Sequence, residues 1–175
     1  MEMKGVTPTL SPSMDIQISS NFERFLFELL DRDSDHLNQV MERFGQEGVF
    51  SVSGDILDRA NAVFSAYRLD DEETRDEIRK VYAGTGEIID PHSIIGVSAA
   101  RRAGDSEHPT IVIGTAHPAK FPDAIRQAIG VDVALPAYAG DLMGLEEKFR
   151  SVSNSADDVK SIIVESAMTT HGENN

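Results

Sequence analysis

One stretch of the sequence concentrates side chains that could do chemistry. The segment IVIGTAHPAKF, residues 111–121, brings a hydroxyl (Thr115), an imidazole (His117) and an amine (Lys120) within six positions. The apolar run Thr110–Gly114 predicts a short buried strand, and the proline after His117 predicts the start of a helix. Open α/β sheets bind ligands where a strand ends and a helix begins. Thr115 is therefore a candidate binding residue, and the alternative is a threonine at an ordinary strand–helix junction.

Lys120 raises the question of covalent catalysis. A lysine that forms a Schiff base needs an amine whose pKa is lowered by burial or by a neighbouring cation. The sequence gives no sign of this, because Lys120 falls in the first turn of an amphipathic helix beside Phe121. A surface lysine whose alkyl chain lies along apolar surface is the expected role. His117 receives no catalytic assignment.

Two other groups of polar residues admit a functional and a structural interpretation. Asp90 and His92, in the sequence DPHS, are a possible acid–imidazole pair, but Asp90 is also a natural N-cap for a helix that begins with proline. Asn21 and Arg24 could bind an anion at a helix N-terminus, or could belong to a solvated helix face. The five histidines do not have the spacing of metal-binding motifs, and no glycine-rich nucleotide loop or GxSxG sequence occurs. We expect no metal site.

The composition narrows the classes of partner. The chain has 175 residues, 30 of them acidic and 16 basic, and it contains no cysteine. A nucleic-acid or acidic membrane surface needs clustered lysine and arginine, which are scattered here. We expect no nucleic-acid partner and no membrane partner. The absence of cysteines and of a signal-peptide pattern fits a cytoplasmic protein.

Amphipathic patterns predict a chain made mostly of helices. The expected helices cover residues 20–30, 33–45, 53–67, 70–84, 91–104, 118–128, 145–152 and 156–167. Ser20 and Glu23 form a predicted capping box, Gly45 is a natural stop, and residues 84–86 are a predicted helix-ending turn.

The predicted organisation has three parts. Residues 1–19 form an extended or loop segment, in which Met14, Ile16 and Ile18 alternate as if the segment packs on something. Residues 20–168 form a helix-rich α/β region, and residues 169–175 a disordered tail. A single buried strand cannot make a sheet, so either further strands escape detection or the chain is part of a larger α/β protein.

Three segments in the same order resemble the threonine synthase family. They are TLSPSMDIQISSNFERFLFELL (residues 9–30), EIIDPHSIIGV (residues 87–97) and TAHPAKFPDAI (residues 115–125). Together they are specific, and the similarity extends over nearly the whole chain. It covers only the C-terminal part of that enzyme.

The resemblance implies a helix-rich C-terminal portion of a tryptophan-synthase-β-like fold, which is fold type II of the pyridoxal-phosphate enzymes. Threonine synthases convert O-phospho-L-homoserine and water to L-threonine and phosphate with pyridoxal phosphate. The family's Schiff-base lysine and its cofactor-phosphate loop lie in the N-terminal portion, so Lys120 is not the covalent lysine and no catalytic residue is expected here. By position in the family's motif, Thr115 would hydrogen-bond the pyridine nitrogen of the cofactor.

Further expectations follow from the partial coverage. The isolated polypeptide should lack threonine synthase activity, and the strand at residues 110–114 should belong to a sheet whose other strands are absent, with exposed edges that favour self-association. Two alternatives remain open from the residues. One is part of another fold type II enzyme with a different amino-acid substrate, and the other is a stand-alone acidic helical interaction module.

Overall fold

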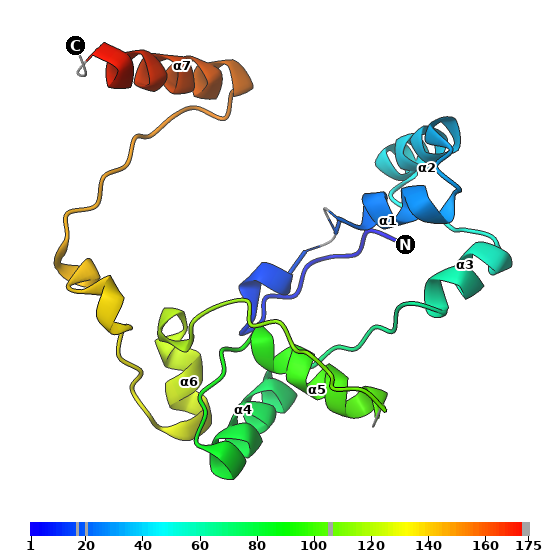
Figure 1. The fold of residues 1–175 in the computed structure, drawn as a ribbon. Coiled ribbons are helices and arrows are strands. Elements are labelled where there is room, and N and C mark those ends of the chain that lie inside the picture. The colour runs from blue at the N-terminus through cyan, green and yellow to red at the C-terminus, as the bar shows by residue number, and fades with distance from the viewer. Residues whose placement is uncertain (17, 20, 105–106, 173–175) are drawn as a thin grey trace. The chain divides into compact units, whose positions relative to one another are not determined.

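The protein is built of helices joined by irregular segments (Figure 1). The computed structural model describes residues 1–16, 18–19, 21–104 and 107–172, with residues 168–172 by backbone alone. The chain separates into two units, Met1–Ala134 and Leu135–Asn175. Within the described ranges the β structure is limited to a single antiparallel bridge between Glu2 and Val49. The expected helix-rich fold with few strands is confirmed.

The first three helices gather around one apolar cluster. They are α1 (Phe22–Leu29), α2 (Ser34–Glu47) and α3 (Gly54–Asn61). The buried members of the cluster are Leu26, Leu30, Leu37, Phe44 and Phe50. The chain start is fastened beside it, because the amide of Phe50 donates to the carbonyl of Met1 at 2.9 Å. Residues 1–3 are therefore held by pairing with residues 48–50, which no sequence pattern indicated.

Two predicted helix ends are wrong. Helix α2 passes through Gly45 and ends where Gly48 adopts a left-handed φ of 70°, a conformation that glycine takes without steric cost. Helix α3 stops at Asn61, and Val63 and Phe64 beyond it are largely exposed instead of lining an apolar helix face. Amphipathic spacing alone gave no stop signal there. Ser20 of the predicted capping box lies outside the described residues.

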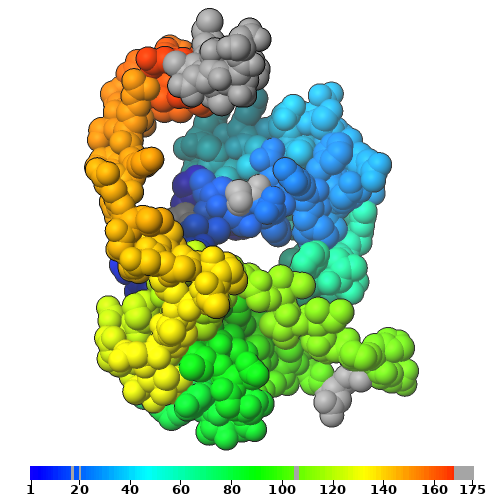
Figure 2. Space-filling model, turned by 60° about the vertical axis from the view of Figure 1, so that its left-hand side comes forward, coloured from blue at the N-terminus to red at the C-terminus, as the bar shows by residue number. Residues whose placement is uncertain are grey.

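The next three helices form a second cluster, which is continuous in the space-filling view (Figure 2). They are α4 (Asp71–Thr85), α5 (Ser93–Ala103) and α6 (Pro122–Ile129). Its buried side chains are Ile78, Val81, Ile94, Ile125 and Ala128. A capping box between Asp70 and Glu73 starts α4. The helix ends at Gly86 with φ 77°, which confirms the predicted turn at residues 84–86.

Ion pairs join α4 to α5 at their surface. The carboxylate of Glu77 lies 2.7 Å from Lys80 Nζ and 2.7 Å from Arg101 Nη1. These cations hold the pKa of Glu77 below its usual value, with the Lys80 hydrogen bond as the largest cause. Since Arg101 is half-exposed, water screens part of this attraction.

The segment Thr110–Gly114 is not a buried strand. Ile111 and Ile113 are 82 % and 72 % exposed, and the segment pairs with no other strand in the described part of the chain. A strand needs neighbours that accept and donate its backbone hydrogen bonds. The described residues provide no such neighbour, so the expectation of exposed sheet edges is also wrong.

The second unit is mostly irregular chain and one long helix. Two short 3-10 turns occur at Ala137–Ala139 and Leu142–Gly144. The helix expected over Leu145–Val152 is absent. Helix α7 (Ala156–Gly172) begins with acidic residues that suit a helix N-terminus and continues into the tail that we expected to be disordered. Within the described residues, none of the helices has both the length and the apolar character needed to cross a bilayer.

The contrast between the second cluster and the exposed segment predicts opposite mutational effects. Ile125→Ala should lower the free energy of unfolding by about 2–5 kcal/mol, because Ile125 is fully buried. Ile113→Ala should change it by less than about 0.5 kcal/mol, since its side chain is largely in solvent. Urea unfolding followed by circular dichroism measures both. An equal loss in the two variants would contradict the exposed position of Ile113.

Candidate functional site

The start of α5 is organised by one buried carboxylate. Asp90 Oδ1 accepts the backbone N–H groups of His92 at 2.9 Å and Ser93 at 3.3 Å. The amide of Ile94 closes the first helical turn on the Asp90 carbonyl at 3.0 Å. Asp90 is 1 % exposed. Asp90 thus accepts N–H groups at this end of α5, but the helix begins at Ser93 and its N-cap position is His92, so the predicted start with Asp90 as N-cap and Pro91 as first helical residue is two residues early.

His92 pairs with Asp90, but its ring is also part of the interior. Its Nδ1 lies 3.2 Å from Asp90 Oδ1, and its Nε2 accepts the N–H of Ser13 at 3.2 Å. Because Nε2 acts as an acceptor, the ring is neutral and carries its hydrogen on Nδ1, where it donates to Asp90. The ring packs against Phe121 with centroids 4.6 Å apart. The acid–imidazole pair therefore exists, and it holds three segments of chain together.

The N-terminal segment is tied to this network. In addition to the Ser13 contact, the N–H of Leu10 donates to Asp71 Oδ1 at 2.9 Å, and Thr9 donates through its hydroxyl to Asp15. The expectation that this segment packs on the body of the protein is confirmed for residues 9–15. The alternating Met14, Ile16 and Ile18 do not provide that packing, because all three side chains are exposed.

Thr115 lies against the first residue of α5. The N–H of Thr115 donates to Ser93 Oγ at 2.8 Å, and the two hydroxyl oxygens are 3.3 Å apart. Ser93 is buried, whereas Thr115 is exposed. A hollow of about 260 Å³ lies beside them, and its lining includes Asp90, Ser93, Val97, Val112, Gly114 and Ala116. Thr115 is an exposed residue that lies in the sequence between two residues of the wall of this hollow.

Comparisons with known proteins give this geometry a context. The family described as "Threonine synthase, C-terminal" matches residues 93–163. The threonine synthase of Pseudomonas aeruginosa is 41 % identical over 158 residues, which are 89 % of this chain and 34 % of that protein. The threonine synthase of Corynebacterium glutamicum is 37 % identical, over 93 % of this chain and 34 % of its own length.

Solved structures agree with these sequences. The crystal structure of PLP-bound threonine synthase from Brucella melitensis matches with a TM-score of 0.84 and 44 % identity, over 94 % of this chain and 35 % of that one. The yeast threonine synthase structure matches with a TM-score of 0.80 and 31 % identity. The chain belongs to the threonine synthase family and matches the C-terminal part of its members. It spans about a third of the length of the relatives it matches.

The other residues singled out in the threonine synthase motif TAHPAKF have local structural roles. His117 Nδ1 accepts the N–H of Ala119 at 3.2 Å and so caps the 3-10 turn Pro118–Lys120. Lys120 is exposed at the end of this turn, as expected of a surface lysine.

The remaining candidate sites lack a defined ligand environment. Asn21 and Arg24 are exposed, the Asn21 side chain makes no capping hydrogen bond, and Glu23 lies between them in the sequence. An anion would meet that carboxylate at the same helix end. Among the described residues, no three histidine, aspartate or glutamate side chains gather as metal ligands.

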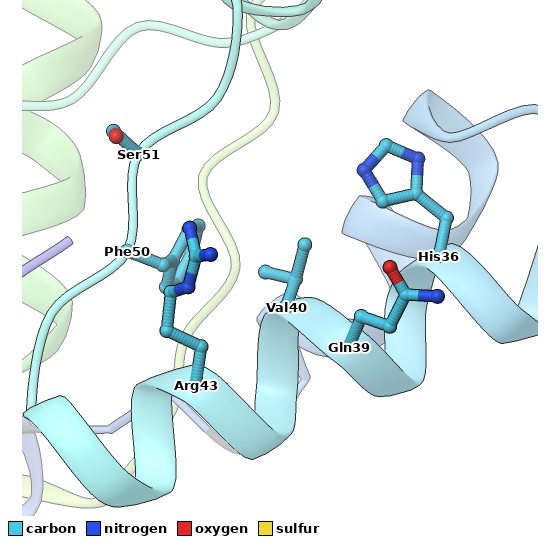
Figure 3. Close-up of a pocket in the computed structure, with 6 residues that line it drawn as sticks. All are labelled: His36, Gln39, Val40, Arg43, Phe50 and Ser51. Atoms are coloured by element: carbon cyan, nitrogen blue, oxygen red, sulfur yellow. The ribbon is translucent and has the colours of Figure 1, made fainter.

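A hollow of about 250 Å³ lies between α2 and the following segment (Figure 3). Its lining residues are His36, Gln39, Val40, Arg43, Phe50 and Ser51. Arg43, the cation of this set, is 3.9 Å from the Glu47 carboxylate, and both side chains are exposed. The hollow is a solvated surface feature, and the polar network at Asp90, Ser93 and Thr115 is the candidate site.

Sequence reasoning identified Thr115 but missed Ser93 and Ser13. Both make contacts across long stretches of chain, 22 residues for Ser93 with Thr115 and 79 for Ser13 with His92. Local patterns do not reveal such pairings. The DPHS sequence was a partial signal, since it places a serine hydroxyl one residue after the buried histidine.

Replacing Asp90 by alanine and by asparagine should have different effects, because only one of its two carboxylate oxygens accepts hydrogen bonds within the described residues. Asp90→Ala removes the acceptor for two helix N–H groups and for His92, so it should cost about 1–3 kcal/mol of unfolding free energy. Asp90→Asn keeps an acceptor oxygen at the Oδ1 position and removes a buried charge. The other carboxylate oxygen of Asp90, Oδ2, has no partner in the described part of the chain. The substitution by asparagine should therefore cost clearly less. Urea unfolding compares them, and an asparagine variant as unstable as the alanine variant would contradict the capping role.

Proposed function

We propose that this chain supplies the C-terminal part of a threonine synthase whose assembled form converts O-phospho-L-homoserine and water to L-threonine and phosphate. Pyridoxal phosphate is the proposed cofactor. Identity of 41 % to the Pseudomonas enzyme over 89 % of the chain supports this proposal. The structural match to a PLP-bound threonine synthase supports the cofactor. The observation that carries the proposal is the position of Thr115, an exposed residue between two residues that line a hollow at the start of α5.

The residues around Thr115 fit a cofactor ring nitrogen. Gly114 and Ala116 line the hollow and have little or no side chain, which leaves room for a flat ring to approach. Pyridoxal phosphate supplies an electron sink for bonds at the substrate amino acid. We assign Thr115 as the residue that hydrogen-bonds its pyridine nitrogen.

A neutral hydroxyl at that position has a chemical consequence. A carboxylate would hold a proton on the ring nitrogen and strengthen the electron sink, whereas a hydroxyl stabilises a protonated nitrogen far less. The ring's electron demand would therefore stay moderate, and other groups would direct the movement of protons. The covalent lysine belongs to the N-terminal portion of the enzyme in this proposal, because Lys120 is exposed and unsuited to the role.

The cellular setting follows from composition. The absence of cysteine supports a cytoplasmic location, and the formal net charge is −14. The same charge disfavours nucleic acids and anionic membranes as partners. The proposed ligands are the small phosphorylated amino acid and the cofactor.

The chain by itself should be inactive. With O-phospho-L-homoserine and added pyridoxal phosphate, the 175-residue polypeptide should release no phosphate above the buffer blank. It should also show no visible absorbance band of lysine-bound cofactor after dialysis. The P. aeruginosa threonine synthase serves as the positive control. Turnover by the chain alone would contradict the assignment of the covalent lysine to another part of the enzyme.

Activity should appear when the missing part is supplied. A chimera that joins this chain to the N-terminal two thirds of the Pseudomonas enzyme should release phosphate, and Thr115→Val should lower its kcat about threefold to tenfold, as expected for a neutral hydrogen bond worth about 0.5–1.5 kcal/mol. Thr110→Val is the matched control, because Thr110 is also exposed and lies outside the site. It should stay within about twofold of the parent chimera.

Two results would contradict the proposal. A chimera that binds no pyridoxal phosphate would argue against the enzyme assignment. A Thr115→Val chimera as active as the parent, with an unchanged cofactor spectrum, would remove Thr115 from the site.

A further inference from the structure

The hydroxyl of Ser93 contacts both the backbone and the side chain of Thr115. The Thr115 N–H donates to Ser93 Oγ at 2.8 Å, and Ser93 Oγ lies 3.3 Å from Thr115 Oγ1. Ser93 is 6 % exposed and is the first residue of α5, directly after the network of Asp90 and His92. Its hydroxyl is therefore held by a rigid helix start, whereas Thr115 is in an irregular segment.

A count of hydrogens and lone pairs limits what each hydroxyl can do. A hydroxyl has one hydrogen to donate and two lone pairs that accept. Ser93 Oγ already accepts the N–H of Thr115. If Ser93 donates its hydrogen to Thr115 Oγ1, the hydrogen of Thr115 remains available to an outside acceptor. If Thr115 donates to Ser93, Thr115 presents only a lone pair to a ligand.

The burial of Ser93 favours the first direction. A buried hydroxyl hydrogen needs an acceptor, because leaving it unpaired costs about 1–3 kcal/mol. In the part of the chain that the structure describes, the acceptor recorded for the Ser93 hydroxyl is Thr115 Oγ1. Ser93 then donates to Thr115, and the hydroxyl hydrogen of Thr115, an exposed residue, is left to donate to a ligand.

We infer that Ser93 is a positioning residue that makes Thr115 a hydrogen-bond donor toward the cofactor's ring nitrogen. The inference rests on the proposed function, in which Thr115 contacts that nitrogen. A donor complements an unprotonated nitrogen, which carries a lone pair and no hydrogen. Ser93 would thus set both the direction of the Thr115 hydroxyl and the protonation state that the contact favours.

The test combines kinetics with a direct observation of the ring nitrogen. The chimeric enzyme is loaded with pyridoxal phosphate labelled with ¹⁵N in the ring, and the nitrogen resonance is recorded for the parent, Thr115→Val and Ser93→Ala. Ser93→Ala should move the resonance in the same direction as Thr115→Val by a smaller amount. It should also lower kcat about threefold to tenfold, as expected for one neutral hydrogen bond.

Matched variants separate positioning from packing. Ser93→Thr keeps a hydroxyl at the same place and should retain the parent resonance. Ser98→Ala removes another buried serine hydroxyl of the same helix α5, away from Thr115 in the recorded hydrogen bonds, and should leave the resonance unchanged. If Ser93→Ala fails to bind cofactor, Ser93→Cys provides the comparison, because a thiol of similar size is a weak donor. It should give a shift between those of the parent and Thr115→Val.

The outcomes distinguish this inference from the proposed function. A resonance that moves with Thr115→Val but stays at the parent value in Ser93→Ala, or in Ser93→Cys where that variant is used, would overturn the role of Ser93 and leave the proposed function intact. A resonance that does not move with Thr115→Val would overturn the contact between Thr115 and the ring, and the inference with it. A Ser98→Ala shift as large as that of Ser93→Ala would show that the effect comes from α5 packing, and would also overturn the role of Ser93.

Discussion

The buried carboxylate of Asp90 is the constraint on which the candidate site depends. One of its oxygens accepts two backbone N–H groups and the ring N–H of His92, and His92 in turn accepts the N–H of Ser13. Desolvating a carboxylate is costly unless hydrogen bonds compensate. The same contacts that compensate for burial also fix where α5 begins. The position of Ser93, and through it that of Thr115, follows from where Asp90 is held.

Sequence predicted those features of the fold that a few neighbouring residues determine. Asp90 before Pro91 marked the start of α5 to within two residues, and the glycines at residues 84–86 marked the end of α4. Features that depend on contacts between residues far apart in the sequence were predicted poorly. The end of α3 is an example, because Phe64 fits an amphipathic helix pattern yet lies beyond the last helical residue and packs edge-on against Phe25. Spacing could not indicate that contact.

The predicted strand at Thr110–Gly114 shows a different limit. Its β-branched residues suit a sheet, but a strand is defined by its pairing with other strands, which local composition cannot supply. The chain covers about a third of the length of its threonine synthase relatives. In the described residues, Ile111 and Ile113 therefore keep a strand-like sequence in an exposed segment. The prediction that this segment is a buried strand is wrong, and the expectation that its partners come from elsewhere stays a prediction.

The candidate site contains a carboxylate, Asp90, and a pair of hydroxyls, Ser93 and Thr115. The recorded hydrogen bonds of Asp90 do not include either hydroxyl. Asp90 is three residues before Ser93, yet Oδ1 is engaged by backbone groups and His92, and no hydrogen bond to the hydroxyl of Ser93 or Thr115 is recorded for either oxygen. The carboxylate therefore reaches Thr115 only through the position it gives to α5 and through its field. In the proposed contact a ligand at Thr115 would meet a neutral hydroxyl, while Asp90, which also lines the hollow, has its Oδ1 engaged by α5 and His92. The proposed role of Thr115 rests on the resemblance, and the proposed direction of its hydrogen bond rests on the burial of Ser93.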